Sequence, residues 1–178
     1  MKNIDAEGKK IQLAESTGTG APLVILHTFQ GEGAEVYAAV KNLTGADFSF
    51  AAIDVPKWDD EMSPWAIPPL FKGDTPCTGG ADKYLGTLTE KILPELLKNL
   101  RAAPKYLALS GYSLAGLFAV YAVYRTNIFS RIASASGSFW FPDFLEYVRV
   151  TFELNPGNHF QDASKRMAKG IARILTAV

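Results

Sequence analysis

The stretch from Lys105 to Tyr124, KYLALSGYSLAGLFAVYAVY, constrains the fold more than any other part of this chain. It opens with a short apolar run at residues 106–109, passes through several small residues, and continues as an apolar segment too long for one strand. Strands are typically about four to eight residues long, so the pattern predicts a buried strand, a sharp turn and then a buried helix. The apex of that turn is Ser113, within the sequence GYSLA of residues 111–115.

A serine at such an apex has the geometry of a nucleophile. A tight strand-to-helix turn pushes the hydroxyl out of the sheet edge, and the N-terminus of the following helix offers backbone N–H groups to a developing oxyanion. The motif departs from G-x-S-x-G, because Ala115 occupies the last position and Gly116 follows it. Alanine is the next smallest side chain, so the helix can still approach the strand closely. The pattern favours a serine hydrolase over the alternative, an ordinary strand-to-helix turn.

The rest of the chain alternates between short apolar runs and longer amphipathic segments. This alternation is typical of an α/β fold with a mostly parallel central sheet, and nothing divides residues 1–178 into more than one domain. Strands are expected at residues 9–15, 21–27, 48–55, 106–109, 131–135 and 151–154. Helices are expected at residues 34–43, 81–101, 114–126, 143–148 and 161–175, with a turn at 155–159. Pro94 should bend its helix or mark a new helical start.

The composition limits the classes of function. The chain has 178 residues, 48% of them apolar, which is enough to bury a sizeable core. The 18 basic and 18 acidic residues give a formal net charge of zero, so nothing favours binding to nucleic acid or to an anionic membrane. We therefore expect a small neutral substrate or a protein partner, with no metal and no cofactor. A homodimer is one alternative for the oligomeric state.

Two features bear on the cellular compartment. The single cysteine, Cys77, cannot form an internal disulfide, which is compatible with a reducing compartment, and it is a poor candidate nucleophile. Residues 1–16 lack the apolar core of a signal peptide, and the longest apolar run, residues 114–124, is too short to span a bilayer. These features predict a cytoplasmic protein.

Residues 56–80 form a long segment rich in proline, glycine and tryptophan, without a helical or strand period. Loops of this length within a compact domain are usually functional or disordered, and the aromatic content argues against disorder. We interpret the segment as a lid-like loop or the wall of a substrate pocket. The alternative is an insertion that covers a sheet edge, with Trp58 and Trp65 as its anchors.

A serine nucleophile needs a base within hydrogen-bond reach, and the chain has two histidines. His159 follows Ser113 in the chain, on a glycine-containing turn, which agrees with the order nucleophile, acid, histidine of hydrolases built on parallel sheets. The alternative for His159 is a turn histidine that bonds to the backbone. His27 ends an early strand, and we expect it to shape the loop that follows rather than to act as the base.

Five segments together resemble a known family. They are GYSLAGLFA at residues 111–119, SRIASASGSFW at 130–140, DEMSPW at 60–65, CTGGAD at 77–82 and NPGNHF at 155–160. From residue 21 onward the chain is similar to bacterial esterases of the α/β-hydrolase superfamily, akin to the enterochelin-esterase group. The resemblance implies a three-layer α/β-hydrolase fold and the hydrolysis of a small carboxylic ester, whose identity such a match does not fix.

The resemblance also implies roles for individual residues. Ser113 matches the nucleophile and His159 the base. The oxyanion donors would be the backbone N–H group of Leu114 and one from Thr28 or Phe29. Candidate substrate-binding side chains are Trp58, Trp65, Tyr112 and Trp140.

A third group, an Asp or Glu, should orient the histidine of such a site and stabilise its imidazolium. In α/β hydrolases this acid follows a strand between the nucleophile and the histidine. Residues 138–150 are too few for the helix, strand and loop that would carry it, since a βαβ unit needs about 30 residues. The acid-bearing strand is therefore predicted to be absent, and the fold to be shortened between the nucleophile and the histidine.

Three explanations for the missing acid stay open. The first explanation is that the natural chain has a further segment near residues 147–151 that this sequence lacks. The second is that a serine–histidine pair works with Asp143, Glu146 or Asp162 in place of the usual acid. The third explanation is a degenerate relative that binds a ligand or a partner without turnover, with residues 56–80 as its binding surface.

Overall fold

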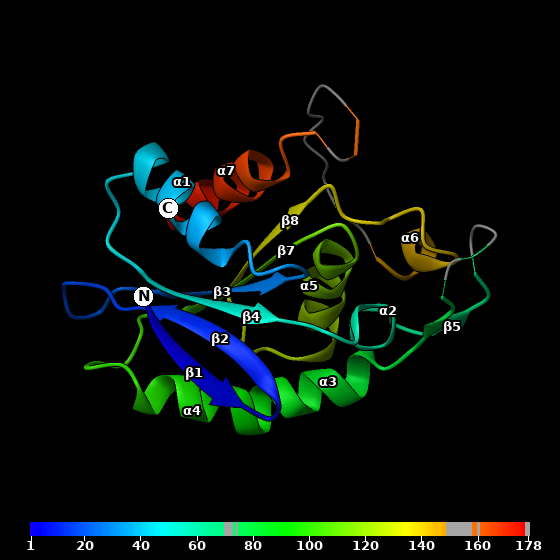
Figure 1. Cartoon of the computed structure of the whole chain (residues 1–178), viewed down its shortest axis with the longest axis horizontal. Helices are drawn as coiled ribbons and strands as arrows, with labels where there is room; N and C mark the ends of the chain where they lie inside the picture. The colour runs from blue at the N-terminus through cyan, green and yellow to red at the C-terminus, as the bar shows by residue number, and fades with distance from the viewer. Residues whose placement is uncertain (70–72, 74, 149–157, 160, 177–178) are drawn as a thin grey trace.

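A six-stranded sheet with helices on both faces forms the centre of the molecule (Figure 1). This computed structural model describes residues 1–69, 73, 75–148, 158–159 and 161–176. The strand order is β1-β2-β4-β3-β7-β8. The strands are β1 (Lys2–Ala6), β2 (Lys9–Ala14), β4 (Ser49–Asp54), β3 (Leu23–Thr28), β7 (Leu107–Tyr112) and β8 (Arg131–Ala135).

The sheet has a parallel part and an antiparallel edge. Strand β3 pairs in parallel with β4 and β7, and β7 pairs in parallel with β8. Strand β2 joins β4 in the antiparallel sense, and β1 joins β2 in the same way. Every residue of β3 is buried, as expected for a parallel strand covered on both faces. The predicted α/β class with a mostly parallel sheet is confirmed; β1 was not predicted, because its sequence KNIDA is polar and mostly exposed.

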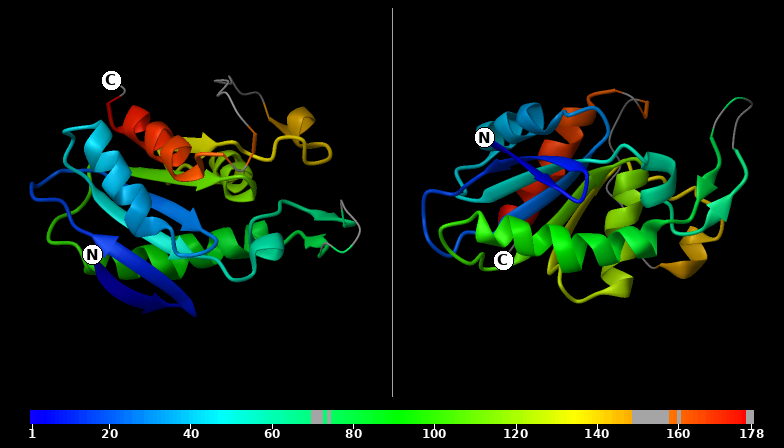
Figure 2. Two further views of the ribbon diagram at one scale, coloured as in Figure 1. Left: turned by 45° about the horizontal axis from the view of Figure 1, so that its top comes forward. Right: turned by 60° about the horizontal axis from the view of Figure 1, so that its bottom comes forward.

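Helices cover both faces of the sheet, which gives the three predicted layers (Figures 1 and 2). Helices α1 and α7 pack against each other on one face, and the remaining long helices lie on the other. These helices are α1 (Gly33–Leu43), α7 (Ala163–Thr176), α3 (Ala81–Thr87), η1 (Leu88–Ile92), α4 (Leu93–Lys98) and α5 (Leu114–Arg125). Alternate residues of β3 divide between the two cores, with Val24 and Leu26 facing α1 and α7, and Leu23 and Ile25 facing α5.

The helical segment α3-η1-α4 changes its hydrogen-bonding pattern in the middle. Helix η1 is a π-helical turn, and the N–H group of Leu93 after it donates to the carbonyl oxygen of Leu88. Pro94 follows at once at the start of α4 and has no N–H group to donate, so regular α-helical bonding cannot run through this point. Pro94 was predicted to bend its helix or to mark a new helical start; the structure has a change of hydrogen bonding here, with α4 beginning at Leu93.

The segment 56–80 contains short elements that the sequence pattern did not reveal. They are α2 (Trp58–Glu61), β5 (Ala66–Ile67) and β6 (Cys77–Thr78), and β5 pairs with β6 in the antiparallel sense. Figure 2 shows β5 and β6 projecting from the body of the molecule. Trp65 ties the segment to the chain around α6 (Phe144–Tyr147), since its indole Nε1 donates to Pro142 O at 3.2 Å and its ring packs on Phe141.

The carboxyl ends of the parallel strands meet at one edge of the sheet, which is where ligands bind in open α/β sheets. In the pairing of β3 with β7, His27 lies opposite Gly111. The chain that follows β3, beginning with Phe29, and the turn at Ser113 therefore both lie at this edge. The predicted strand 151–154 lies outside the described residues, as does most of the predicted turn 155–159.

In the part of the chain that the structure describes, no helix is both long enough and apolar enough to cross a membrane.

Candidate active site

Ser113 occupies a strained turn between β7 and α5. Its backbone has φ 55° and ψ −120°, a conformation that residues with a Cβ atom rarely adopt. Two hydrogen bonds fix the turn: the N–H of Ser113 donates to Ala135 O at 3.1 Å, and the N–H of Leu117 donates to Ser113 O at 3.1 Å. The turn holds the side chain at the sheet edge, immediately before the first residue of α5.

Close packing behind the turn explains the alanine at position 115. A Cβ atom on Gly111 would lie 2.4 Å from the carbonyl carbon of Ala115 and 2.6 Å from its Cβ. Because the strand residue has no side chain, the helix residue can keep its methyl group. A Cβ atom on Gly116 would meet Ser134 Oγ at 2.8 Å. Glycine is thus required at positions 111 and 116, and the departure from G-x-S-x-G leaves the turn intact.

His159 lies next to the serine although the two are 46 residues apart in the chain. Its Nε2 atom is 3.0 Å from Ser113 Oγ. Tyr112, the neighbour of the serine, donates a hydrogen bond from its hydroxyl to the backbone carbonyl of His159. The two rings also touch, with their centroids 5.4 Å apart. A candidate base is therefore within reach of the hydroxyl proton, and Tyr112, predicted to bind substrate, contacts that histidine in this structure.

A second serine lies against the first. Ser138 Oγ is 3.2 Å from Ser113 Oγ, and Ser138 is 1% exposed. Its N–H group donates to Ser113 O at 3.0 Å, so both its backbone and its side chain contact the turn. Sequence reasoning missed Ser138. The only signal was its place inside SRIASASGSFW, which carried the family resemblance without a role for any single residue.

The candidate oxyanion donors differ in their surroundings. Leu114 is the first residue of α5, and the first N–H groups of a helix have no partner within the helix itself. The N–H groups of Phe29 and Gln30 both donate to the carboxylate of Glu32, at 3.3 and 2.9 Å. Thr28 is wholly buried in β3, and its hydroxyl donates to the carboxylate of Asp54 on β4. In this structure the N–H group of Phe29 thus has a carboxylate partner, while Leu114 begins a helix directly after Ser113.

Three aromatic side chains predicted to line the site have different contacts. Trp58 packs edge-on against Phe29, with ring centroids 5.3 Å apart, and Phe29 is 55% exposed. Trp140 is 59% exposed and lies two residues after Ser138. Trp65 donates to Pro142 O and packs on Phe144 of α6, so its contacts in this structure tie the segment 56–80 to the chain around α6.

The three carboxylates considered as the acid lie on the surface. Asp143 precedes α6 in a left-handed conformation with φ 63°, and Glu146 is exposed within α6. Asp162 pairs with Lys165 at 3.4 Å. Among the hydrogen bonds and ion pairs of the described residues, none joins one of these carboxylates to His159. The segment near 147–151, where the sequence could lack residues, lies largely outside the described part of the chain.

The other histidine and the cysteine have no place in this site. His27 is fully buried between the rings of Tyr84 and Phe118, and burial lowers its pKa to about 3, with the charge of Lys9 acting in the same direction. Burial raises the pKa of the Cys77 thiol, which makes it a weaker nucleophile. Among the described residues no group of three or more His, Cys, Asp or Glu side chains could hold a metal ion.

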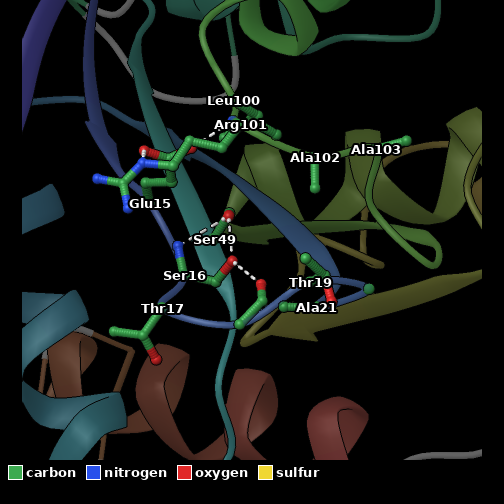
Figure 3. Close-up of a pocket in the computed structure, with 12 residues that line it drawn as sticks. Glu15, Ser16, Thr17, Thr19, Ala21, Ser49, Leu100, Arg101, Ala102 and Ala103 are labelled. Atoms are coloured by element: carbon green, nitrogen blue, oxygen red, sulfur yellow. Dashed lines mark hydrogen bonds and ion pairs between the residues drawn. The ribbon is translucent and has the colours of Figure 1, made fainter.

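A small cavity of about 90 Å³ lies at the opposite edge of the sheet, near the amino ends of β3 and β4 (Figure 3). Ser16 and Ser49 hydrogen-bond to each other there, with Oγ atoms 3.2 Å apart, beside the ion pair of Arg101 and Glu15. No histidine lines this cavity, so its two hydroxyls have no base. The serine with a histidine beside it, Ser113, lies at the carboxyl edge of the sheet instead.

The parallel sheet, the strained serine turn and the adjacent histidine define a protein of the α/β-hydrolase class. A family model described as "Putative esterase" matches residues 31–169, which is more than half of the chain. The chain therefore belongs to this esterase family, a class of hydrolases that act on ester bonds.

Solved structures share the fold at low sequence identity. The BES protein from Bacillus cereus is 22% identical with a TM-score of 0.67, over 82% of this chain and 66% of that one. The siderophore hydrolase EstA from Aspergillus nidulans is 18% identical with a TM-score of 0.61, over 95% of this chain and 76% of that one. The enterobactin and salmochelin hydrolase IroE is 15% identical with a TM-score of 0.60, over 82% and 65%.

The chain thus spans about two thirds of the length of the Bacillus cereus protein and of IroE. No protein with a curated description is similar enough in sequence to count as a match.

Proposed function

We propose that this chain hydrolyses a small carboxylic ester through an acyl-enzyme on Ser113, with His159 as the general base. One observation carries the proposal: Nε2 of His159 lies 3.0 Å from the hydroxyl of a serine that a strained turn holds at the sheet edge. Membership of the esterase family supports the same reaction class.

The proposed reaction has two halves. In the first, Ser113 Oγ forms a bond to the ester carbonyl carbon while its proton moves to His159 Nε2, and the carbonyl oxygen becomes an oxyanion. Collapse of this intermediate breaks the bond to the alcohol, which takes the proton from His159. In the second half, water gives a proton to His159 as it attacks the acyl carbon, and Ser113 leaves with that proton.

We propose the N–H groups of Leu114 and Phe29 as the oxyanion donors. The pairing of His27 with Gly111 puts the chain after β3, which begins with Phe29, at the same sheet edge as Ser113, and Leu114 directly follows the serine. Two preorganised donors of this kind are the largest source of transition-state stabilisation in most acyl transfers. To donate to the oxyanion, the N–H of Phe29 has to break its hydrogen bond to the Glu32 carboxylate. That bond is 3.3 Å long, beyond the usual range for N–H···O bonds.

For the substrate we propose an ester with an apolar or aromatic group. Phe29 after β3, Trp58 at the start of α2 and Trp140, two residues after Ser138, offer partly exposed rings. Aromatic rings bind apolar and planar groups well. One structural neighbour is named a siderophore hydrolase and another an enterobactin and salmochelin hydrolase, and these compounds are a first set for assay.

The test is covalent labelling. Diisopropyl fluorophosphate should add to Ser113, detected by intact mass and peptide mapping, and abolish the hydrolysis of p-nitrophenyl acetate. Ser113→Ala should neither be labelled nor turn over ester above about 10⁻⁴ of the wild-type kcat, since loss of the nucleophile usually costs that much or more. A matched control is Ser134→Ala, which removes a buried hydroxyl that has no hydrogen-bond partner among the described residues.

An unlabelled wild-type protein with no esterase activity would overturn the proposal and favour a binding protein built on the same scaffold.

A further inference from the structure

The hydroxyl of Ser138 is placed where it can act on the nucleophile. Its Oγ lies 3.2 Å from Ser113 Oγ, which is within hydrogen-bond distance. Ser138 is 1% exposed, so water cannot easily replace its hydroxyl. Among the described residues, Ser113 Oγ has two polar neighbours, the ring nitrogen of His159 and the hydroxyl of Ser138.

The backbone around Ser138 fixes this contact. The N–H of Ser138 donates to Ser113 O at 3.0 Å, and its own carbonyl accepts the N–H of Phe141 at 2.9 Å. The chain reaches this position through Ser136, which has φ 47°, and Gly137, where a Cβ atom would lie 2.5 Å from Ser134 Oγ. A strained, closely packed loop after β8 thus places one hydroxyl against Ser113 Oγ. Such backbone strain persists only where the surrounding structure holds it, and it is common at functional sites.

The direction of the hydrogen bond follows from the base. Ser113 has one hydroxyl proton, and that proton points to His159 Nε2 when the histidine acts as base. Ser113 Oγ can then only accept from Ser138, so the proton between the two serines belongs to Ser138.

We propose that Ser138 is a catalytic residue whose hydroxyl donates to Ser113 Oγ and stabilises the negative charge that develops there as the proton leaves. This inference rests on the proposed esterase function and extends it. A donor to a developing alkoxide is a charge-assisted hydrogen bond, stronger than one between neutral groups. It lowers the barrier in the first half-reaction, when Oγ attacks, and again in the second, when Oγ leaves the acyl carbon. Ser138 keeps its own proton throughout.

Two other roles for Ser138 make different predictions. If Ser138 were the nucleophile, the covalent label would appear on it rather than on Ser113. If Ser138 only shaped the loop, its loss would lower stability and activity together. The proposed role predicts a loss of rate with little loss of stability, since Ser138→Ala keeps both backbone hydrogen bonds and removes one oxygen atom.

The experiment compares Ser138→Ala with Ser138→Thr and with the matched control Ser134→Ala. Ser138→Thr keeps the hydroxyl, and Ser134→Ala removes a neighbouring buried hydroxyl that does not contact Ser113. For each variant we would measure kcat and kcat/KM with p-nitrophenyl acetate, the rate of labelling by diisopropyl fluorophosphate, competitive inhibition by the product acid, and the thermal midpoint.

We expect Ser138→Ala to lower kcat, kcat/KM and the labelling rate by about 10- to 100-fold, the range for a hydrogen bond to a charged group. The inhibition constant should stay within about twofold and the thermal midpoint close to that of the control, because neither binding nor folding uses the contact with Oγ. Ser138→Thr should recover most of the labelling rate, and Ser134→Ala should match the wild type.

Three results would overturn the inference: a Ser138→Ala labelling rate within about twofold of the wild type, a label found on Ser138, or losses of rate that follow the thermal midpoint across all variants. If Ser113 itself is neither labelled nor required for turnover, the proposed function fails instead, so the two failures are distinguishable.

Discussion

The burial of His27 makes the stability of this protein depend on pH. The side chain is fully buried between Tyr84 and Phe118, and neither ring nitrogen has a hydrogen-bond partner among the described residues. Burial is the main cause that lowers its pKa from 6.5 to about 3, and the nearby charge of Lys9 adds to the effect. Lys9 is itself buried against the ring of Tyr84 and pairs with Glu61.

The sign follows from proton binding in the two states. Between pH 6.5 and about pH 3 the unfolded chain carries a proton on this imidazole and the folded chain does not. The unfolded state therefore binds more protons, so His27 contributes its full stability above pH 6.5 and loses it as the pH falls. Each pH unit inside this window costs about 1.4 kcal/mol. The loss from pH 7.5 to pH 5 is about 2 kcal/mol, which lowers the thermal midpoint by about 4 to 8 °C.

The assay is chemical unfolding of the wild type and of His27→Leu at pH values from 7.5 to 5. Leucine removes the titrating group and breaks no hydrogen bond that the structure describes. The two proteins differ only at position 27, so the difference between their two unfolding free energies isolates His27. We expect that difference to change by about 2 kcal/mol in favour of the variant on going to pH 5. A difference that stays constant over this range would refute the buried, neutral imidazole.

Two further predictions concern the serine turn. Gly111→Ala should lower the free energy of unfolding by about 1 to 3 kcal/mol, because its Cβ would overlap the Ala115 backbone at 2.4 Å. Urea unfolding measures this change, and an unchanged midpoint would contradict the close packing. Tyr112→Phe removes the hydrogen bond to the His159 carbonyl, so kcat should fall by about 3- to 10-fold with a small change in thermal midpoint. A Tyr112→Phe variant with wild-type kcat would show that the histidine is held without this hydroxyl.

The sequence predicted the parts of this molecule that depend on local pattern. The apolar runs of β3, β4 and β7 were recognised because both faces of a central parallel strand are buried. The turn at Ser113 was recognised because its small residues and the apolar helix after it lie within one short stretch. The edge strand β1 was missed since its residues are polar and exposed, and such strands carry little pattern.

The parts that depend on distant contacts could not be predicted in the same way. The loop that brings Ser138 to Ser113 has a positive φ at Ser136. Serine rarely adopts this conformation, so the sequence pattern did not predict it. The hydrogen bond from the Tyr112 hydroxyl to the His159 backbone joins residues 47 positions apart, so no local pattern could indicate it. Glu32 was not considered, because a carboxylate that accepts backbone N–H groups in its own turn looks like any exposed acid in the sequence.

The strained turn also bears on the order in which activity is acquired during folding. Its backbone is held by Ala135 and Ser138, both supplied by the chain at the end of β8, and β8 joins β7 across the whole length of α5. Parallel strands that are this far apart in the chain pair late in folding, because the chain between them must be ordered first. His159 is supplied from still further along the chain. We therefore expect refolding chains to regain helical content before the contact between Ser113 and His159 forms, so that esterase activity returns later than helical circular dichroism.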